Sequence, residues 1–398
     1  MQNLSEKLTF LCGTAEDLEA APETPVLQMF SERIIGFLSA LSSELMHDEH
    51  IRNMPDVLSY AYWIRKASLL SAMEKYPDHK NKLGRGIAFH IAPSNVPVNF
   101  AVSMTSSLLA GNITVVRVSD KPFEQVSVIC NAIKRLTAAE FADIRKYLII
   151  VRYPHDDEVT QAISSVCDLR IIWGGDRTIA SIRRASLPPR AVEMTFADRH
   201  SVAVIDSDHY LQQDAAAVAK GFYTDTYYTD QNACSSPRLV FWMGSKIEEA
   251  QERFWAALAK LVHSDYDMKP VQAVDKYSML CSLGMYQTGV HLTGHDNLMM
   301  RIKADKLTPE LMDHKMSGGY FFEYSGTTLD ELVPVLGKRC QTIAVLGVEK
   351  KDILDLAMKY GVRGVDRVVP LGETMGLEFI WDGYKMIEAM TRLIYTGA

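Results

Sequence analysis

The residue best suited to chemistry is Cys234, in the stretch "YYTDQNACSSPR" (227–238). Cysteine is usually a buried small hydrophobe, whereas small polar and amide residues surround this one. A thiolate here could act as a nucleophile, but a free thiol with a pKa of about 8.5 is only a few per cent ionised at neutral pH. No histidine lies within twenty residues. Ionisation of the Cys234 thiol would therefore be favoured by backbone dipoles, a bound cofactor or Arg238. The alternative interpretation is that Cys234 has only a structural role.

Asn95 stands in "APSNVPVNF" (92–100), where a strand is expected to meet a helix. An asparagine side chain in that place can donate an N–H group to a developing oxyanion, a contact that lowers a barrier by roughly 3 kcal/mol. It can equally cap the following helix. The residue types leave both interpretations open.

Charged residues end the β-branched segment of "VVRVSDKPF" (115–123). Asp120 is placed to accept the hydroxyl groups of a ribose, and Arg117 and Lys121 could hold an adenosine 2′-phosphate. A solvated strand end is the alternative interpretation. These residues favour a nucleotide site without establishing one.

Two glycines in "WGGDRT" (173–178), Gly174 and Gly175, close a strand and open a short helix. Glycine lets the backbone approach a phosphate, and a helix N-terminus supplies N–H donors. A plain turn between strand and helix would also use glycine. The pair is a candidate phosphate-binding turn.

Strand-like and helix-like segments alternate from about residue 86, which predicts βαβ units and a mainly parallel sheet. Ligands bind such sheets at the carboxyl ends of the strands. We therefore expect an α/β fold with a nucleotide-binding domain ending near residue 200, followed by a second alternating set. The expected strands are 86–93, 113–118, 147–154, 169–175, 190–196, 201–206, 238–243, 318–324, 341–348 and 365–372. The expected helices lie within 27–75 and at 95–112, 121–136, 156–166, 177–184, 214–224, 246–263 and 352–361.

The composition is that of a globular protein of two or three domains, with 398 residues, 47% of them hydrophobic and 23% charged. A net charge of −7 argues against a nucleic-acid partner. No window of eighteen uncharged apolar residues predicts a membrane span, and the N-terminus does not resemble a signal peptide, so a cytoplasmic location is expected. The six cysteines and eleven histidines lack metal-binding spacings, so no metal site is expected.

Three ordered groups of residues resemble the aldehyde dehydrogenase superfamily, and within it the LuxC-type acyl-CoA reductases of bacterial bioluminescence. "PSNVP" followed by "LLAGNITVVRVSDKP" resembles the P-W-N-F-P and A-G-N-x-V-V-x-K-P-S-E segments of the superfamily. "DQNACSSPR" resembles its catalytic loop, with the A-C-S-S-P form typical of the acyl-CoA reductases. The C-terminal segments are also similar to that family: "CQTIAVLGV", "VDRVVPLGETM" and "WDGYKMI".

The resemblance implies a Rossmann-type cofactor domain and an α/β catalytic domain. Residues 1–200 would hold N-terminal helices and the dinucleotide-binding domain, segment 363–398 would pack back on it, and 201–362 would form the catalytic domain. It makes Cys234 the nucleophile and Asn95 the oxyanion donor, together with the Cys234 N–H. Arg117, Ser119 and Asp120 would fall on the adenosine-binding positions, next to the candidate cation Lys121, and Gly174 and Gly175 on the phosphate turn.

The implied activity is NAD(P)H-dependent reduction of an acyl-CoA to the aldehyde through a cysteine thioester. The cationic pair Arg117 and Lys121 favours NADPH over NADH. A homo-oligomer is expected, and an acyl-activating enzyme would be a suitable partner. The glutamate that activates water in hydrolytic relatives has only Glu193 as a counterpart, and Glu323 matches the family's ribose contact poorly. An acyl-phosphate reductase, a hydrolytic aldehyde dehydrogenase and a non-catalytic binding partner of an acyl-activating enzyme remain the alternatives.

Overall fold

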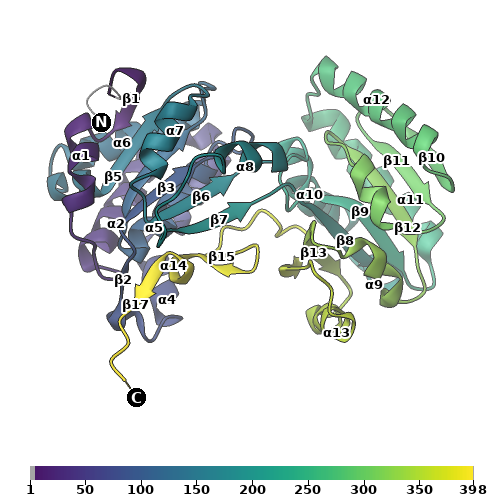
Figure 1. The fold of residues 1–398 in the computed structure, drawn as a ribbon. Helices are drawn as coiled ribbons and strands as arrows, with labels where there is room; N and C mark the ends of the chain where they lie inside the picture. The colour runs from purple at the N-terminus through teal and green to yellow at the C-terminus, as the bar shows by residue number, and fades with distance from the viewer. Residues whose placement is uncertain (1–4, 398) are drawn as a thin grey trace. The chain divides into compact units, whose positions relative to one another are not determined.

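The chain, described for residues 5–397 by a computed structural model, divides into two compact units (Figure 1). The first unit runs to Ala197 and takes up the chain again from Leu377, and the second unit is Asp198–Gly376. The segment expected to return to the first unit from residue 363 therefore joins it only at Leu377. The reason is that β14 (Arg367–Pro370) pairs with β13 (Cys340–Leu346), so both strands belong to the second unit.

A six-stranded sheet forms the centre of the first unit, in the order β1-β5-β4-β3-β6-β7. Every pairing is parallel except that of β1 with β5, as expected for βαβ units. The strands are β1 (Thr9–Cys12), β3 (Ile87–Ile91), β4 (Ile113–Val118), β5 (Leu148–Arg152), β6 (Leu169–Trp173) and β7 (Val192–Phe196).

Helices surround this sheet, and every residue of the central strands β3, β4 and β6 is buried. Burial on both faces explains why these strands are continuous apolar, β-branched runs instead of alternating ones. The helices are α1 (Ala15–Ala20), α2 (Glu32–Met46), α3 (Pro55–Trp63), α4 (Lys66–Glu74), α5 (Asn99–Ala110), α6 (Glu124–Thr137), α7 (Asp157–Ser164) and α8 (Asp176–Ile182).

The C-terminal segment is tied to the first unit by short strands and side-chain contacts. β17 (Thr391–Leu393) pairs with β2 (Lys82–Gly84), β15 (Ile380–Trp381) pairs with β16 (Tyr384–Lys385), and α14 (Met386–Ala389) lies between them in the chain. The side chain of Asn112 donates to the carbonyl of Met390 at 3.0 Å. These contacts hold the last residues beside the start of the sheet.

A seven-stranded sheet forms the second unit, in the order β10-β11-β12-β9-β8-β13-β14. Only the pairing of β10 with β11 is antiparallel. The strands besides β13 and β14 are β8 (His200–Asp206), β9 (Pro237–Met243), β10 (Val290–His295), β11 (Met300–Ala304) and β12 (Tyr320–Ser325). The helices are α9 (Ser207–Tyr210), α10 (Ala215–Asp225), α11 (Ile247–Asp265), α12 (Pro270–Tyr286) and α13 (Lys350–Tyr360).

Alternate residues of the central strands pack into two separate cores. Val202 and Val204 of β8 face the core that receives α12 and α13, whereas Ala203 and Ile205 face the core that receives α10 and α11. This two-sided burial holds the amino ends of β8, β9 and β13 rigidly together. The loop that carries Cys234 enters β9 at that end.

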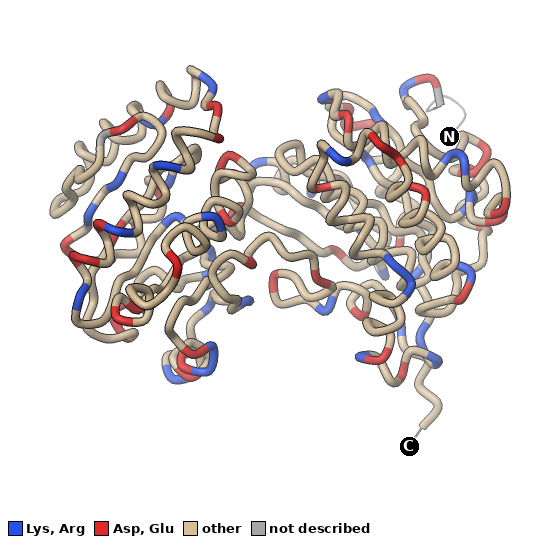
Figure 2. The backbone as a smooth tube through the Cα atoms, turned by 180° about the vertical axis from the view of Figure 1, so that it is seen from behind, with Lys and Arg blue, Asp and Glu red and all other residues tan. Residues whose placement is uncertain are grey.

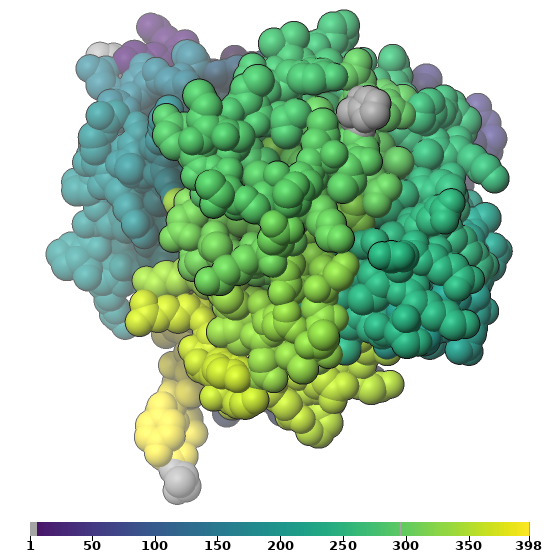
Figure 3. Space-filling view, turned by 90° about the vertical axis from the view of Figure 1, so that its right-hand side faces the viewer, coloured from purple at the N-terminus to yellow at the C-terminus, as the bar shows by residue number. Residues whose placement is uncertain are grey.

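Several large apolar side chains of helix α12 are exposed. Figure 3 views the second unit from the side on which α12 and β10 lie. The exposed apolar residues of α12 are Val271, Val274, Tyr277, Met285 and Tyr286.

Charged residues of both signs are interspersed along the backbone of each unit (Figure 2). None of the helices within residues 5–397 is long and apolar enough to cross a membrane.

Candidate active site

Cys234 lies in the loop between the 3-10 helix η6 (Tyr227–Thr229) and β9. All six cysteines fall in the described part of the chain, and Cys234 is the one that is half-buried. Cys281 on α12 is exposed, while the other four are buried. Burial raises the pKa of the Cys340 thiol to about 12, so that thiol stays protonated. The thiol of Cys234 is therefore partly accessible to solvent.

Gln231 anchors the loop through a buried side chain that makes four hydrogen bonds. Its amide donates to the carbonyls of Pro237 at 2.9 Å and Tyr320 at 3.2 Å. Its oxygen accepts from the backbone N–H groups of Gly319 and Tyr320, both at 3.0 Å. These bonds satisfy the whole amide and fix the loop against β9 and β12.

The backbone just before the cysteine is held in an unusual conformation. Asp230 and Gln231 both have positive φ angles, 52° and 56°, which non-glycine residues rarely adopt. Such a conformation costs on the order of 1 kcal/mol or more per residue and persists only where other contacts enforce it. The four bonds of Gln231 and a bond from the Tyr266 hydroxyl to Asp230 at 2.8 Å supply that constraint.

Two buried side chains contact Cys234 itself. The side-chain amide of Gln341, at the start of β13, donates to Cys234 Sγ at 3.1 Å. The hydroxyl of Ser201, near the start of β8, donates to the Cys234 carbonyl at 2.7 Å. A hydrogen bond to sulfur favours the thiolate over the thiol. Neither Ser201 nor Gln341 was expected from the sequence as a site residue.

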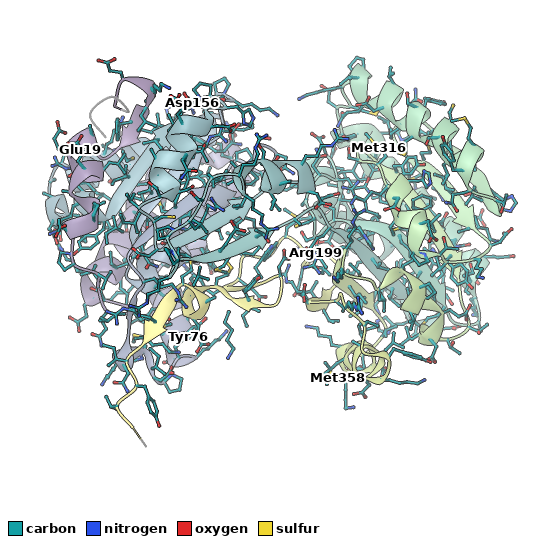
Figure 4. The ribbon with its side chains drawn as sticks, viewed as in Figure 1. Glu19, Tyr76, Asp156, Arg199, Met316 and Met358 are labelled. Atoms are coloured by element: carbon teal, nitrogen blue, oxygen red, sulfur yellow. The ribbon has the colours of Figure 1, made fainter. Side chains whose placement is uncertain are left out.

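Arg238 is a buried cation four residues after Cys234. Its guanidinium donates to the carbonyl of Met316, which is labelled in Figure 4. Burial lowers the pKa of Arg238 to about 10, and the negative charge of Asp198, followed by that of a Cys234 thiolate, opposes that shift. The group stays cationic at neutral pH, so it stabilises the thiolate electrostatically.

The segment after β14 lies beside the cysteine loop and is fixed by Asp225 at the end of α10. The Asp225 carboxylate accepts from the N–H groups of Gly372 at 2.6 Å and Thr374 at 2.9 Å. Burial raises the pKa of this carboxyl group to about 6. The Ser235 hydroxyl reaches Met375 Sδ at 3.7 Å, which joins the two segments.

In the first unit, Asn95 lies exposed in the loop between β3 and α5. The predicted helix start at residue 95 is wrong, because α5 begins at Asn99 and Val98 is its N-cap residue. A residue before proline disfavours helical angles, which explains why Val96-Pro97 precedes the helix. The cap interpretation of Asn95 is therefore wrong as well.

The residues expected to bind adenosine follow β4 directly. Arg117 is buried and donates to the Tyr153 carbonyl at 3.2 Å, with its charge 3.9 Å from Asp120. Asp120 and Lys121 are exposed, and Lys121 Nζ donates to the Ser94 carbonyl at 3.4 Å. The Ser119 hydroxyl accepts from the Lys121 N–H at 3.2 Å. Helix α6 begins only at Glu124, three residues later than predicted.

Gly174 and Gly175 follow β6, and Gly175 is the N-cap residue of the short helix α8. A Cβ atom on Gly174 would lie 3.0 Å from the Thr178 side chain, whereas one on Gly175 would meet nothing within 4 Å. Because β4, β3 and β6 are adjacent parallel strands, their carboxyl ends lie at one edge of the sheet. The structure thus brings Asn95, the residues after β4 and the two glycines to the same edge.

The comparisons with known proteins decide the family. The model of the acyl-CoA reductase family LuxC matches residues 24–275, more than half of the chain. The chain belongs to the LuxC family. The predicted resemblance to the LuxC-type reductases is therefore confirmed. The predicted fold class, an α/β fold like that of the aldehyde dehydrogenases, is confirmed by the solved structures.

The proteins of named activity that this chain resembles are distant in sequence and longer than this chain. The long-chain acyl-protein thioester reductase of Aliivibrio fischeri is 24% identical over 299 residues, which cover 72% of this chain and 58% of the relative. The NADP-dependent glyceraldehyde-3-phosphate dehydrogenase of Nicotiana plumbaginifolia is 28% identical over 244 residues, 58% of this chain and 47% of that protein. The match thus spans little more than half the length of the first relative.

The fold itself is that of the aldehyde dehydrogenases. The crystal structure of aldehyde dehydrogenase 21 from Physcomitrella patens aligns with a TM-score of 0.68 over 94% of this chain and 87% of that one. The two chains are 11% identical in sequence, so the likeness concerns the fold alone.

The two glutamates considered from the sequence are both committed to internal ion pairs. Glu193 on β7 accepts from Arg170 at 2.5 Å and from Arg183 at 2.6 Å. Glu323 on β12 is buried and accepts from Trp242, Trp255 and Arg301 at 3.2, 2.6 and 2.8 Å. Contacts of this kind are structural, and they leave little capacity for a base or a ribose contact. Residues 5–397 contain no group of three or more His, Cys, Asp or Glu that could hold a metal ion.

Proposed function

We propose that this LuxC-family chain reduces an acyl-CoA thioester to the aldehyde through a covalent thioester on Cys234. The observation that carries the proposal is the half-buried Cys234 on a loop anchored by Gln231, with an amide N–H of Gln341 donating to its sulfur. A thiolate held in this way attacks the acyl carbonyl carbon and expels the CoA thiolate. The acyl group is then attached to the enzyme as a thioester.

The oxyanion formed in this attack needs N–H donors. The Cys234 backbone N–H is one candidate, and the family resemblance makes the Asn95 side chain the other. When bound, a nicotinamide cofactor supplies the hydride that reduces the enzyme thioester. Collapse of the resulting hemithioacetal releases the aldehyde and returns Cys234 as the thiolate, which is a good leaving group and needs no strong general acid.

The superfamily uses NAD(P), and the edge of the first sheet suits such a cofactor. Asp120 is exposed beyond β4, where a carboxylate can accept ribose hydroxyls, and Ser119 lies beside it. A Cβ atom on Gly175 would meet nothing within 4 Å, which supports the proposal that a phosphate group approaches the backbone at the start of α8. We assign Arg117, Ser119, Asp120, Lys121, Gly174 and Gly175 to cofactor binding, with NADPH favoured over NADH.

Lys121→Ala should raise the KM for NADPH about fivefold while changing the KM for NADH much less. The reason is that Lys121 is the exposed cation after β4, whereas the guanidinium of Arg117 is buried against Tyr153. A charge-assisted contact between Lys121 and the 2′-phosphate of NADPH is worth about 1 kcal/mol, and its loss raises the KM for NADPH about fivefold. Steady-state kinetics with both cofactors measures it, and Lys75→Ala, an exposed lysine on another part of the unit, is the control. Equal effects on NADPH and NADH would remove the 2′-phosphate assignment.

Three alternatives remain, and the structure bears on them unequally. A hydrolytic aldehyde dehydrogenase needs a free carboxylate, and the pairing of Glu193 with Arg170 and Arg183 disfavours that function. An acyl-phosphate reductase would keep Cys234 and needs cations near the leaving group. A non-catalytic binding partner would have no use for a thiol held by Gln341.

One assay separates these functions: NAD(P)H oxidation with acyl-CoAs of different chain length, an acyl phosphate, and an acyl group carried on a protein thioester. The last substrate is included because the Aliivibrio fischeri relative is named for it. We expect turnover with at least one acyl-CoA. Turnover with the acyl phosphate alone would favour the first alternative, and aldehyde oxidation without thioester reduction would favour the hydrolytic one. The homo-oligomer and an acyl-activating partner stay predictions from the family.

A further inference from the structure

The sheet of the second unit is irregular on both sides of Ser201. Along β8 and β9, Ser201 pairs with Pro237 and the next residue pairs with Leu239, so Arg238 is an extra residue in β9. Along β13, Cys340 and Ile343 pair with residues of β8 that are only two apart, so β13 also contains one extra residue. Bulges of this kind redirect side chains and are frequent beside active sites.

The bulge in β13 directs a side chain to the sulfur of Cys234, and the bulge in β9 contains a buried cation. That cation is Arg238, whose guanidinium donates to the carbonyl of Met316. The bulge in β13 contains Gln341, whose amide N–H reaches Cys234 Sγ at 3.1 Å. Gln341 is 107 positions from Cys234 in the chain, yet an irregularity of the sheet brings its amide to the sulfur atom.

Ser201 joins the second bulge to the cysteine loop. Its hydroxyl oxygen accepts from the backbone N–H of Thr342 at 3.2 Å, a donor that the irregular ladder leaves available. The same hydroxyl donates to the Cys234 carbonyl at 2.7 Å. One buried side chain therefore fixes the distance between β13 and the loop.

The orientation of the Gln341 amide follows from its neighbour. The Thr342 hydroxyl donates to Gln341 Oε1 at 3.3 Å, which leaves the amide nitrogen facing the sulfur. Gln341 is 1% exposed, so water does not compete freely for these bonds. A donor held in this way stabilises the thiolate more than the thiol.

We propose that Gln341 is a positioning residue that keeps Cys234 in its reactive thiolate form, with the β13 bulge and Ser201 fixing its amide against the sulfur. The inference rests on the proposed function only in taking Cys234 as the nucleophile. In this arrangement a neutral amide donates to the sulfur of Cys234. Reactivity of the thiol is thus a property of the folded chain before any substrate binds.

The test is the pH dependence of Cys234 alkylation by iodoacetamide, measured by mass spectrometry of the peptide. Every protein carries Cys281→Ala, because Cys281 is the exposed thiol and the remaining four are buried. Gln341→Met removes the donor at similar size, and Gln341→Glu also adds a negative charge. We expect the midpoint of the alkylation profile to rise by about one pH unit in Gln341→Met and further in Gln341→Glu.

Midpoints equal to that of the parent in both variants would overturn the inference. A purely structural role would lower the melting temperature without moving the midpoint, so circular dichroism melts accompany each profile. If Gln341→Glu does not fold, Gln341→Asn takes its place: it keeps an amide one methylene farther from the sulfur, and its midpoint should also rise. Alkylation needs no acyl substrate, so a shifted midpoint in a protein inactive toward every acyl-CoA would refute the proposed function and keep this inference.

Discussion

Cys234→Ala is expected to reduce acyl-CoA-dependent oxidation of NAD(P)H by a factor of roughly 10³ or more. Without the sulfur no enzyme thioester forms, and the hydride acceptor of the second half-reaction is absent. The loop itself is held by Gln231, but alanine removes the sulfur that accepts a hydrogen bond from the buried Gln341 amide, at a cost of about 1 kcal/mol. Steady-state assays should therefore show a loss of kcat far larger than the small fall in melting temperature explains.

Two variants provide matched controls for this loss. Cys281→Ala removes the exposed thiol of α12 and should retain full activity, which excludes a general effect of cysteine removal. Glu193→Gln should keep reductase activity and lower the melting temperature instead, because it weakens the buried pair with Arg170. Activity of Cys234→Ala within tenfold of the parent would contradict the mechanism.

An acyl-enzyme should also be directly observable. The parent protein incubated with an acyl-CoA and no cofactor should gain the mass of one acyl group on the peptide that contains Cys234. The alanine variant should gain none. Acylation at a different residue would show that Cys234 is not the nucleophile, even if its removal lowers the rate.

The fold was predictable where burial gives a strong local pattern. The β-branched segment "ITVVRV" predicted a strand at 113–118, and β4 is Ile113–Val118. Helix α12, by contrast, was not predicted, because its apolar residues are distributed over exposed as well as buried positions and give no single apolar face. The edge strand β10 and its neighbour β11, which follow α12 in the chain, were missed too, as was β1.

The site was predictable only in part, for a physical reason. Cys234 could be found because a polar setting is unusual for cysteine and because the loop resembles a known family. Ser201 and Gln341 lie inside ordinary strand sequences, and nothing local marks them as partners of a residue 33 or 107 positions away. Their roles depend on bulges, which arise from strand pairing and not from the strand's own residues. The helix start at Asn95 was mispredicted because Pro97 was taken as the first turn.

Gln231→Leu is expected to cost about 4 kcal/mol of unfolding free energy and to abolish activity. Leucine has a similar size but leaves the carbonyls of Pro237 and Tyr320 and the N–H groups of Gly319 and Tyr320 without partners. Each buried backbone group without a partner costs about 1 kcal/mol or more. For a unit of this size the melting temperature should fall by roughly 10 °C, measured by circular dichroism.

Activity should fall further than stability alone explains, because the same bonds enforce the positive φ angles of Asp230 and Gln231. Once released, the loop relaxes to ordinary angles and withdraws Cys234 from Gln341, so its alkylation midpoint should rise as in Gln341→Met. Gln212→Leu makes the same change at an exposed residue after α9 and should alter stability by less than about 0.5 kcal/mol. A Gln231→Leu protein that melts at a lower temperature with an unchanged alkylation midpoint would show that the loop keeps its shape without this anchor, and that β9 and β13 alone position the nucleophile.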